Sequence, residues 1–229
     1  DTTLYPKFTK NVEDDAREQT LRTISDHLLN QEADYRDLFD SRKTFLTPAL
    51  AALYGVPIPI RQEMGGRVPW VPYEYQEDHI RIGLLGQATF LSLFSHPGAS
   101  SPTLRGKAVR EHLLCQTIPP PPGDVDFSLV RDNDNPEFRT VRDRLTEHRD
   151  NPTCAGCHML MDPIGLALEV FDASGVYRTL ENGAPIDTSG EWLGQEYNDV
   201  RELAIMLKED PTLTSCLVQR AYNYGTARE

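Results

Sequence analysis

The chain has 229 residues, enough for one large or two small domains that each bury a core. Its 23 basic and 35 acidic side chains give a formal net charge of −12. This charge argues against nucleic acid and against anionic membrane surfaces as partners, because both are bound through clustered Lys and Arg. It would attract a basic protein partner, although a role in solubility explains it equally well.

Two features bear on the location of the chain. No run of about 18 apolar residues occurs, so we expect no membrane-spanning segment in this chain. The sequence begins at Asp1 without a methionine or a recognisable signal peptide, and we expect a mature or truncated product.

Helical periodicity dominates the first half of the chain. Apolar residues such as Val12, Ala16 and Leu21 lie three to five positions apart, which predicts an amphipathic helix over residues 11–30. Thr47 is a predicted N-cap, followed by Pro48 at the first helical position. Further helices are expected over residues 34–39, 47–55, 82–93 and 104–115, with a Pro- and Gly-rich loop over residues 56–79.

A proline run marks the middle of the chain. Residues 118–123 read Ile-Pro-Pro-Pro-Pro-Gly, which predicts a stiff polyproline II spacer, with a recognition ligand as the alternative. We place a linker at residues 119–136. Residues 131–137 resemble half of a calcium-binding loop but lack its glycine and distal glutamate, so we expect a polar turn there. A helix over residues 137–148 follows.

The most informative stretch is residues 154–163, which read Cys-Ala-Gly-Cys-His-Met-Leu-Met-Asp-Pro. Cys-x-x-Cys-His is the signature of c-type haem attachment. Thiols three positions apart on one helical turn, Cys154 and Cys157, can bond the two vinyl groups of one porphyrin. His158 follows at once and can bind the iron as its proximal ligand. The motif therefore predicts one covalently bound haem c.

Two other uses of a Cys-x-x-Cys pair remain open. A thioredoxin-like redox pair would require a strand–helix setting, and the Asn-Pro-Thr segment before Cys154 does not resemble the end of an apolar strand. A zinc site would require a second pair of ligands, and Cys115 and Cys216 are single, distant cysteines. Both alternatives fit the sequence less well than haem.

Cys115 and Cys216 remain outside the motif. Covalent haem attachment takes place outside the bacterial cytosol, where disulfides also persist, so we expect a periplasmic or cell-surface protein. A Cys115–Cys216 disulfide would stabilise so long a loop by about 4–5 kcal/mol in the chain-entropy model. Two buried free thiols are the alternative.

The second axial ligand of the iron decides between electron transfer and ligand binding. Met206 is the candidate by chain order, and its alternative role is to fill core among neighbouring leucines. Met159 and Met161 are too close to His158 to cross the porphyrin. His96 and His112 come next, although a surface role fits each of them at least as well.

Basic groups could bind the haem propionates by charge and shape. The candidates are His148, Arg149, Arg105 and Arg178. A surface role is an equally good explanation for each arginine.

The rest of the chain completes a mainly α prediction. Residues 164–171 should continue the motif helix, residues 176–195 suggest a small hairpin, and two helices are expected over residues 199–208 and 213–224. We predict a helical domain at residues 1–118, the linker at 119–136 and a cytochrome c-like haem domain at 137–229, with long Pro- and Gly-rich loops.

A series of motifs along the chain resembles a known family. The stretches are residues 154–169, 171–175, 177–178, 45–57, 81–85, 101–106, 118–123 and 186–190. They resemble the planctomycete-type cytochrome-like proteins, large secreted bacterial chains built from serial domains of unknown function. The resemblance runs from about Tyr5 to Arg228, although the family's usual end, Tyr-Ala-x-Gly-Arg, is altered here. It implies a C-terminal, mainly helical single-haem module and no established reaction.

We therefore expect a single-haem c-type cytochrome that transfers one electron to or from a redox protein partner, with no nucleic-acid partner, and that forms part of a larger assembly. One alternative is a haem enzyme with an open sixth position, such as a peroxidase-like activity. Another is a surface-assembly protein in which the haem stabilises the fold.

Overall fold

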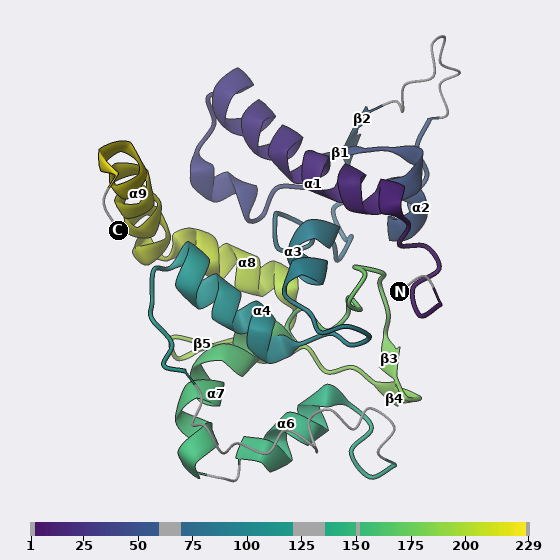
Figure 1. Ribbon diagram of the computed structural model, residues 1–229, viewed down its shortest axis with the longest axis vertical. Helices are drawn as coiled ribbons and strands as arrows, with labels where there is room; N and C mark the ends of the chain where they lie inside the picture. Colours follow the sequence, from purple (N-terminus) through teal and green to yellow (C-terminus); the bar gives the residue numbers. More distant parts are fainter. Residues whose placement is uncertain (1–2, 60–69, 121–135, 150–151, 228–229) are drawn as a thin grey trace. The chain divides into compact units, whose positions relative to one another are not determined.

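The computed structural model describes residues 3–59, 70–120, 136–149 and 152–227 (Figure 1). The described chain is mainly helical, with three short two-stranded sheets, which confirms the predicted class. None of the described helices is long and apolar enough to cross a membrane. The linker predicted at residues 119–136 and the polar turn at residues 131–137 lie mostly outside the described residues.

Contacts divide the chain into two compact units. The first unit consists of Asp1–Ser100 together with Phe171–Tyr177, and the second unit of Ser101–Val170 and Arg178–Glu229. The predicted domain boundaries at residues 118 and 137 stay a prediction.

The first unit contains three α-helices and one two-stranded antiparallel sheet within the described residues. Their bounds are α1 Lys10–Ser25, α2 Pro48–Tyr54, α3 Ala88–Leu93, β1 Lys43–Leu46 and β2 Val71–Glu74, with a π-helical turn at Asp26–Asn30 and a 3₁₀ turn at Tyr35–Leu38. Strands β1 and β2 pair antiparallel, with Lys43 opposite Glu74. Thr47 caps α2 as predicted, since its hydroxyl accepts from the N–H of Leu50.

The buried face of α1 differs from the predicted apolar face. Val12 and Ala16 are buried as expected, but Leu21 is 50 % exposed, while Gln19 is fully buried. The Gln19 side-chain amide donates to the Thr44 hydroxyl at 2.9 Å and accepts from the Tyr54 hydroxyl at 2.7 Å. These bonds satisfy the buried amide and explain why a polar residue can replace an apolar one at this position.

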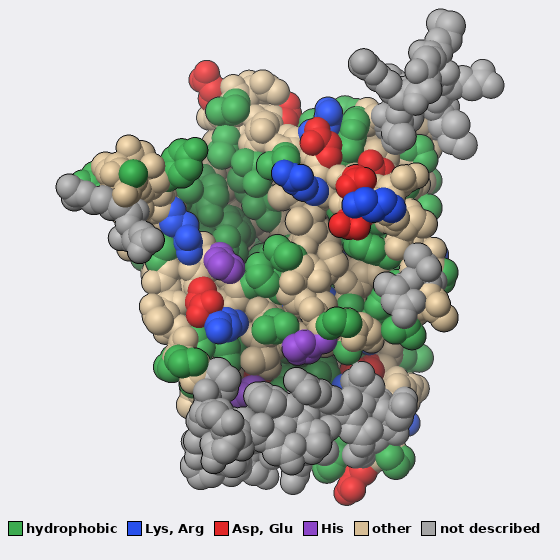
Figure 2. Space-filling model, in the orientation of Figure 1, with side chains coloured by type: hydrophobic (Ala, Val, Ile, Leu, Met, Phe, Trp, Pro, Cys, Tyr) green, Lys and Arg blue, Asp and Glu red, His purple; other side chains and the backbone are tan. Residues whose placement is uncertain are grey.

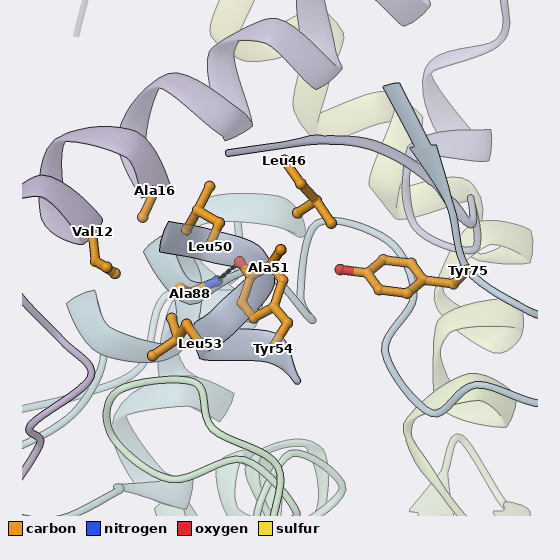
Figure 3. Packing of buried hydrophobic residues seen from close by; sticks show 9 residues of the cluster. All are labelled: Val12, Ala16, Leu46, Leu50, Ala51, Leu53, Tyr54, Tyr75 and Ala88. Atoms are coloured by element: carbon orange, nitrogen blue, oxygen red, sulfur yellow. Dashed lines mark hydrogen bonds between the residues drawn. The ribbon is translucent and has the colours of Figure 1, made fainter. Parts of the chain in front are cut away.

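The core of the first unit forms around α2. Its buried members are Val12, Ala16, Leu46, Leu50, Ala51, Leu53, Tyr54, Tyr75 and Ala88, drawn in Figure 3. The Tyr54 hydroxyl accepts from the backbone N–H of Ala88 at 2.9 Å, which fixes the start of α3 against α2 (Figure 3). Polar bonds thus give this small core one specific arrangement.

Arg81 links residues 171–177 to the rest of the first unit. Its guanidinium is buried between the rings of Tyr54 and Phe171, at 4.0 and 4.4 Å from their centroids. It donates to the backbone carbonyl of Gly175 at 2.5 Å and to that of Gly86. Burial lowers the pKa of Arg81, while Tyr75, Tyr54 and Asp172 act in the opposite direction.

The surface of the first unit carries paired charges. Figure 2 shows acidic and basic side chains side by side over α1. Lys10 lies 3.2 Å from Asp14, and Arg22 lies 2.8 Å from Glu18. Exposed pairs of this kind contribute about 0.3–0.5 kcal/mol each, so they add more to solubility than to stability.

The second unit contains five described α-helices and two hairpins. Their bounds are α4 Pro102–Ala108, α6 Val141–Arg149, α7 Pro152–Leu166, α8 Val200–Glu209, α9 Pro211–Thr226, β3 Leu180–Glu181, β4 Ala184–Pro185, β5 Gly190–Trp192 and β6 Gln195–Tyr197, with a π-helical turn at Val109–Leu113. The two C-terminal helices agree with prediction, and the expected small hairpin is two hairpins.

Helices α4 and α7 approach each other unusually closely (Figure 1). A Cβ atom at Gly106 of α4 would lie 2.6 Å from the carbonyl carbon of Met161 and closer still to its oxygen. A Cβ atom at Gly165 of α7 would lie 2.5 Å from the Cα of Pro102. Glycine is needed on both helices because any side chain would separate the two backbones.

Buried ion pairs and a disulfide complete the second unit. Glu169 is 1 % exposed and binds Arg105 at 3.2 Å and Arg178 at 2.8 Å. The disulfide predicted between Cys115 and Cys216 is present, which excludes the alternative of two free thiols. It ties the chain after the π-helical turn to α9.

Candidate functional site

The three residues of the haem-attachment motif lie on helix α7 of the second unit. Cys154, Cys157 and His158 are spaced i, i+3 and i+4, so they share one face of the helix. Cys154 is buried, whereas Cys157 and His158 are partly exposed. Both cysteines are free thiols. The local helix therefore brings two thiols and an imidazole together, as covalent haem attachment requires.

A buried carboxylate orients the imidazole of His158. The Nδ1 atom of His158 lies 2.9 and 3.1 Å from the two carboxylate oxygens of Asp162, one turn further along α7. Asp162 is fully buried and accepts a second hydrogen bond, at 2.9 Å, from the Thr103 hydroxyl of α4. An ionised carboxylate can only accept, so in the neutral imidazole Nδ1 carries the proton and Nε2 has the lone pair.

Side chains from other elements of the second unit hold the backbone of α7 beside the motif. Arg110 donates from Nε to the carbonyl of Leu160 at 2.8 Å. The Tyr197 hydroxyl donates to the carbonyl of Pro163, the proline inside the helix. Together with the close approach of Gly106 to Met161, these contacts fix the turn that carries Asp162.

Arg110 makes further contacts within the second unit. Its guanidinium also donates to the side chain of Gln116 at 2.7 Å and lies over the Trp192 ring, 4.6 Å from the centroid. Burial lowers the pKa of Arg110, and Asp210 opposes that shift. The guanidinium stays charged at neutral pH, because its ordinary pKa is far above 7.

The candidate distal ligand lies on a different helix. Met206 is half-buried on α8, next to the buried Leu203 and Leu207. Its assignment as a ligand stays a prediction. Met161 is buried, and Met159 is 67 % exposed.

The other predicted haem contacts fall into three groups. Arg105 and Arg178 bind Glu169, and propionate binding by either stays a prediction. His96 and His112 are exposed. The side chains of His148 and Arg149 lie outside the described residues.

Sequence reasoning missed Asp162, Thr103 and Arg110. The i, i+4 spacing of His158 and Asp162 was a usable signal, because such residues are neighbours on a helix. Thr103 lies 59 positions from Asp162, and no local pattern connects them. Arg110 likewise reaches α7 only through the tertiary fold.

Two further observations concern alternative sites. Within the described part of the chain, no group of three or more His, Cys, Asp or Glu side chains could hold a metal ion, which gives the zinc alternative no second ligand pair. A cavity of about 370 Å³ in the first unit includes Asp26 and His27 in its lining. These two already bind neighbours, Asp26 through Gln31 and His27 through the carbonyl of Asp34.

Two family models match parts of the chain. Residues 81–181 match PSCyt3, a protein of unknown function (DUF1588), and residues 1–56 match PSD4, a protein of unknown function (DUF1592). No curated protein and no solved structure matches the chain. The two matches fit the resemblance to planctomycete-type cytochrome-like proteins, and neither description assigns a cofactor. The match at residues 81–181 includes the motif, Asp162 and Thr103.

Proposed function

We propose that the chain binds one haem c through thioethers to Cys154 and Cys157, with His158 as the proximal ligand, and that it transfers single electrons outside the cytosol. One observation carries the proposal. The two free thiols and the imidazole share one face of α7, and the imidazole is held with its proton on Nδ1. Nε2 is then the nitrogen suited to bind iron.

Each residue has a distinct task in this proposal. Cys154 and Cys157 fix the porphyrin covalently, and His158 supplies the axial nitrogen. Asp162 holds the ring of His158 in one orientation and one tautomer. When bound, the iron supplies the one-electron chemistry.

Charge and redox compartment support the assignment to an extracytosolic electron carrier. The Cys115–Cys216 disulfide fits an oxidising compartment, where covalent haem attachment also takes place. The net charge of −12 favours a basic redox protein as the partner, through long-range attraction. Such attraction weakens with salt, so electron exchange with that partner should slow as ionic strength rises.

The test is to produce the chain in a bacterial periplasm with haem-attachment machinery and measure its intact mass. We expect the wild-type chain to gain the mass of one haem. Cys154→Ser and Cys157→Ser should each lose one thioether and yield little stable product, while Gly156→Ala, between the two cysteines, should mature normally. A wild-type chain without haem, where a known cytochrome c matures in the same cells, would refute the proposal.

A haem enzyme with an open sixth position is the second candidate. The carboxylate on Nδ1 of His158 favours it, because such a bond raises the basicity of the axial ligand. The absorption spectrum separates the two. A low-spin spectrum unchanged by cyanide supports the electron carrier, and a high-spin spectrum that shifts with cyanide supports the enzyme.

A further inference from the structure

We propose that Asp162 is a positioning residue that sets the tautomer of His158 and lowers the reduction potential of the iron that His158 binds. The part about the potential rests on the proposed function. The part about the tautomer concerns only side chains that the structure describes.

The carboxylate of Asp162 is held from two directions. It receives the Nδ1–H of His158 from its own helix and the hydroxyl of Thr103 from α4. Thr103 and Gly106 lie on the same short helix, and Gly106 packs directly on the backbone of Met161, the residue before Asp162. The two hydrogen bonds and the packed backbone before Asp162 therefore hold the carboxylate beside the imidazole.

The bond to His158 lies in a largely water-free place. Asp162 is fully buried, and the side chain of His158 is 14 % exposed. A hydrogen bond between an imidazole and a carboxylate is stronger here than in water, because the effective dielectric constant is lower. The pair can therefore keep one tautomer without a bound ligand.

The same bond has a consequence for oxidation state. A carboxylate that accepts from Nδ1–H moves electron density onto the ring and makes Nε2 a stronger donor. A stronger donor, with a negative charge behind it, stabilises ferric iron more than ferrous iron. Asp162 thereby lowers the reduction potential.

Asp162→Asn removes the charge at nearly constant shape. Two variants serve as controls. Glu209→Gln makes the same change of charge at an exposed position on α8. Thr103→Val removes the second hydrogen bond to Asp162 but keeps its charge.

The first measurement uses the chain without haem. Nitrogen-15 NMR of the histidine rings should show His158 with its proton on Nδ1 in the wild type, in Glu209→Gln and in Thr103→Val. In Asp162→Asn the Nε2-protonated form should appear, because the amide can donate to Nδ1. An Nε2-protonated His158 in the wild type, or the same tautomer in all four proteins, would overturn the assignment.

The second measurement is the midpoint potential of the haem-loaded proteins. We expect the midpoint potential of Asp162→Asn to be higher than that of the wild type. For a one-electron couple, each tenfold loss of preference for ferric iron raises the potential by about 59 mV. The midpoint potential of Glu209→Gln should stay near that of the wild type, and the potential of Thr103→Val should shift less than that of Asp162→Asn. Equal shifts in Thr103→Val and Asp162→Asn would trace the effect to loosened packing and overturn the proposal. Failure to bind haem would refute the proposed function alone, because the NMR result still decides the role of Asp162.

Discussion

The contact between α4 and α7 can be tested with a single methyl group. In Gly106→Ala the new Cβ would lie 2.6 Å from the carbonyl carbon of Met161, where ordinary van der Waals contacts are 3.4–4 Å. The obstacle is backbone, so it cannot move aside by changing a rotamer. The helices must separate, and over-packing of this kind costs about 1–3 kcal/mol.

Helix propensity offsets part of this loss. Replacing Gly by Ala inside a helix gains about 1 kcal/mol. Gly156 on α7 isolates that gain, because no described atom other than its chain neighbours and the backbone of its own helix lies within 4 Å of where its Cβ would be. Gly156→Ala should therefore stabilise the chain by about 0.5–1 kcal/mol.

The assay is thermal and urea unfolding followed by circular dichroism. Gly106→Ala should lower the midpoint temperature by about 2–4 °C for each kcal/mol lost, and Gly156→Ala should raise it. The NMR signal of His158 should also change in Gly106→Ala, since Met161 precedes Asp162. A rise in the midpoint temperature of Gly106→Ala equal to that of Gly156→Ala would refute the close approach of the two backbones.

Three more predictions concern the disulfide, the buried ion pairs and one histidine. Reducing the Cys115–Cys216 disulfide, which closes a separation of 101 residues, should destabilise the chain by about 2–5 kcal/mol, as measured by unfolding with and without reductant. Glu169→Gln leaves the guanidinium groups of Arg105 and Arg178 without their buried carboxylate, so it should lower the free energy of unfolding in urea by about 3–5 kcal/mol. The control Glu191→Gln, on the surface, should change it by almost nothing. Similar losses in the two variants would contradict the ion-pair assignment. Burial lowers the pKa of His79 below its ordinary 6.5, and Nδ1 of the ring accepts from the backbone N–H of Arg81, a bond that only the unprotonated nitrogen can make. The stability that the neutral ring contributes is therefore present above pH 6.5 and is lost as the pH falls through the lowered pKa. The midpoint temperature of unfolding should fall over this pH range in the wild type, and it should fall less in His79→Gln.

Local signals in the sequence indicated most helices, although the helix predicted over residues 82–93 forms only at Ala88–Leu93 and α7 ends at Leu166 instead of continuing to residue 171. Thr47 and Pro48 marked the start of α2, and the unpaired Cys115 and Cys216 indicated their own disulfide. The same signals failed for Gln19. A polar residue on a helix is ordinarily exposed, and only Thr44 and Tyr54, from elsewhere in the chain, make its burial favourable.

The candidate site shows the same division. Cys154, Cys157 and His158 were evident because their chemistry depends on spacing along one turn. Thr103, the partner of Asp162 on α4, was not evident, because its contact depends on how closely two helices can approach. Gly106 and Gly165 explain that approach, but a glycine in a sequence does not indicate which backbone it faces.

Residues 171–177 limit how the protein can be divided for experiments. Arg81 needs the carbonyl of Gly175 and the ring of Phe171, both supplied from far beyond Ser100. A fragment that stops at Ser100 would bury a guanidinium with one of its acceptors missing and should be prone to aggregate. The first unit therefore completes its fold only after the motif helix has been synthesised, so a ribosome paused before residue 171 would hold an unfinished protein.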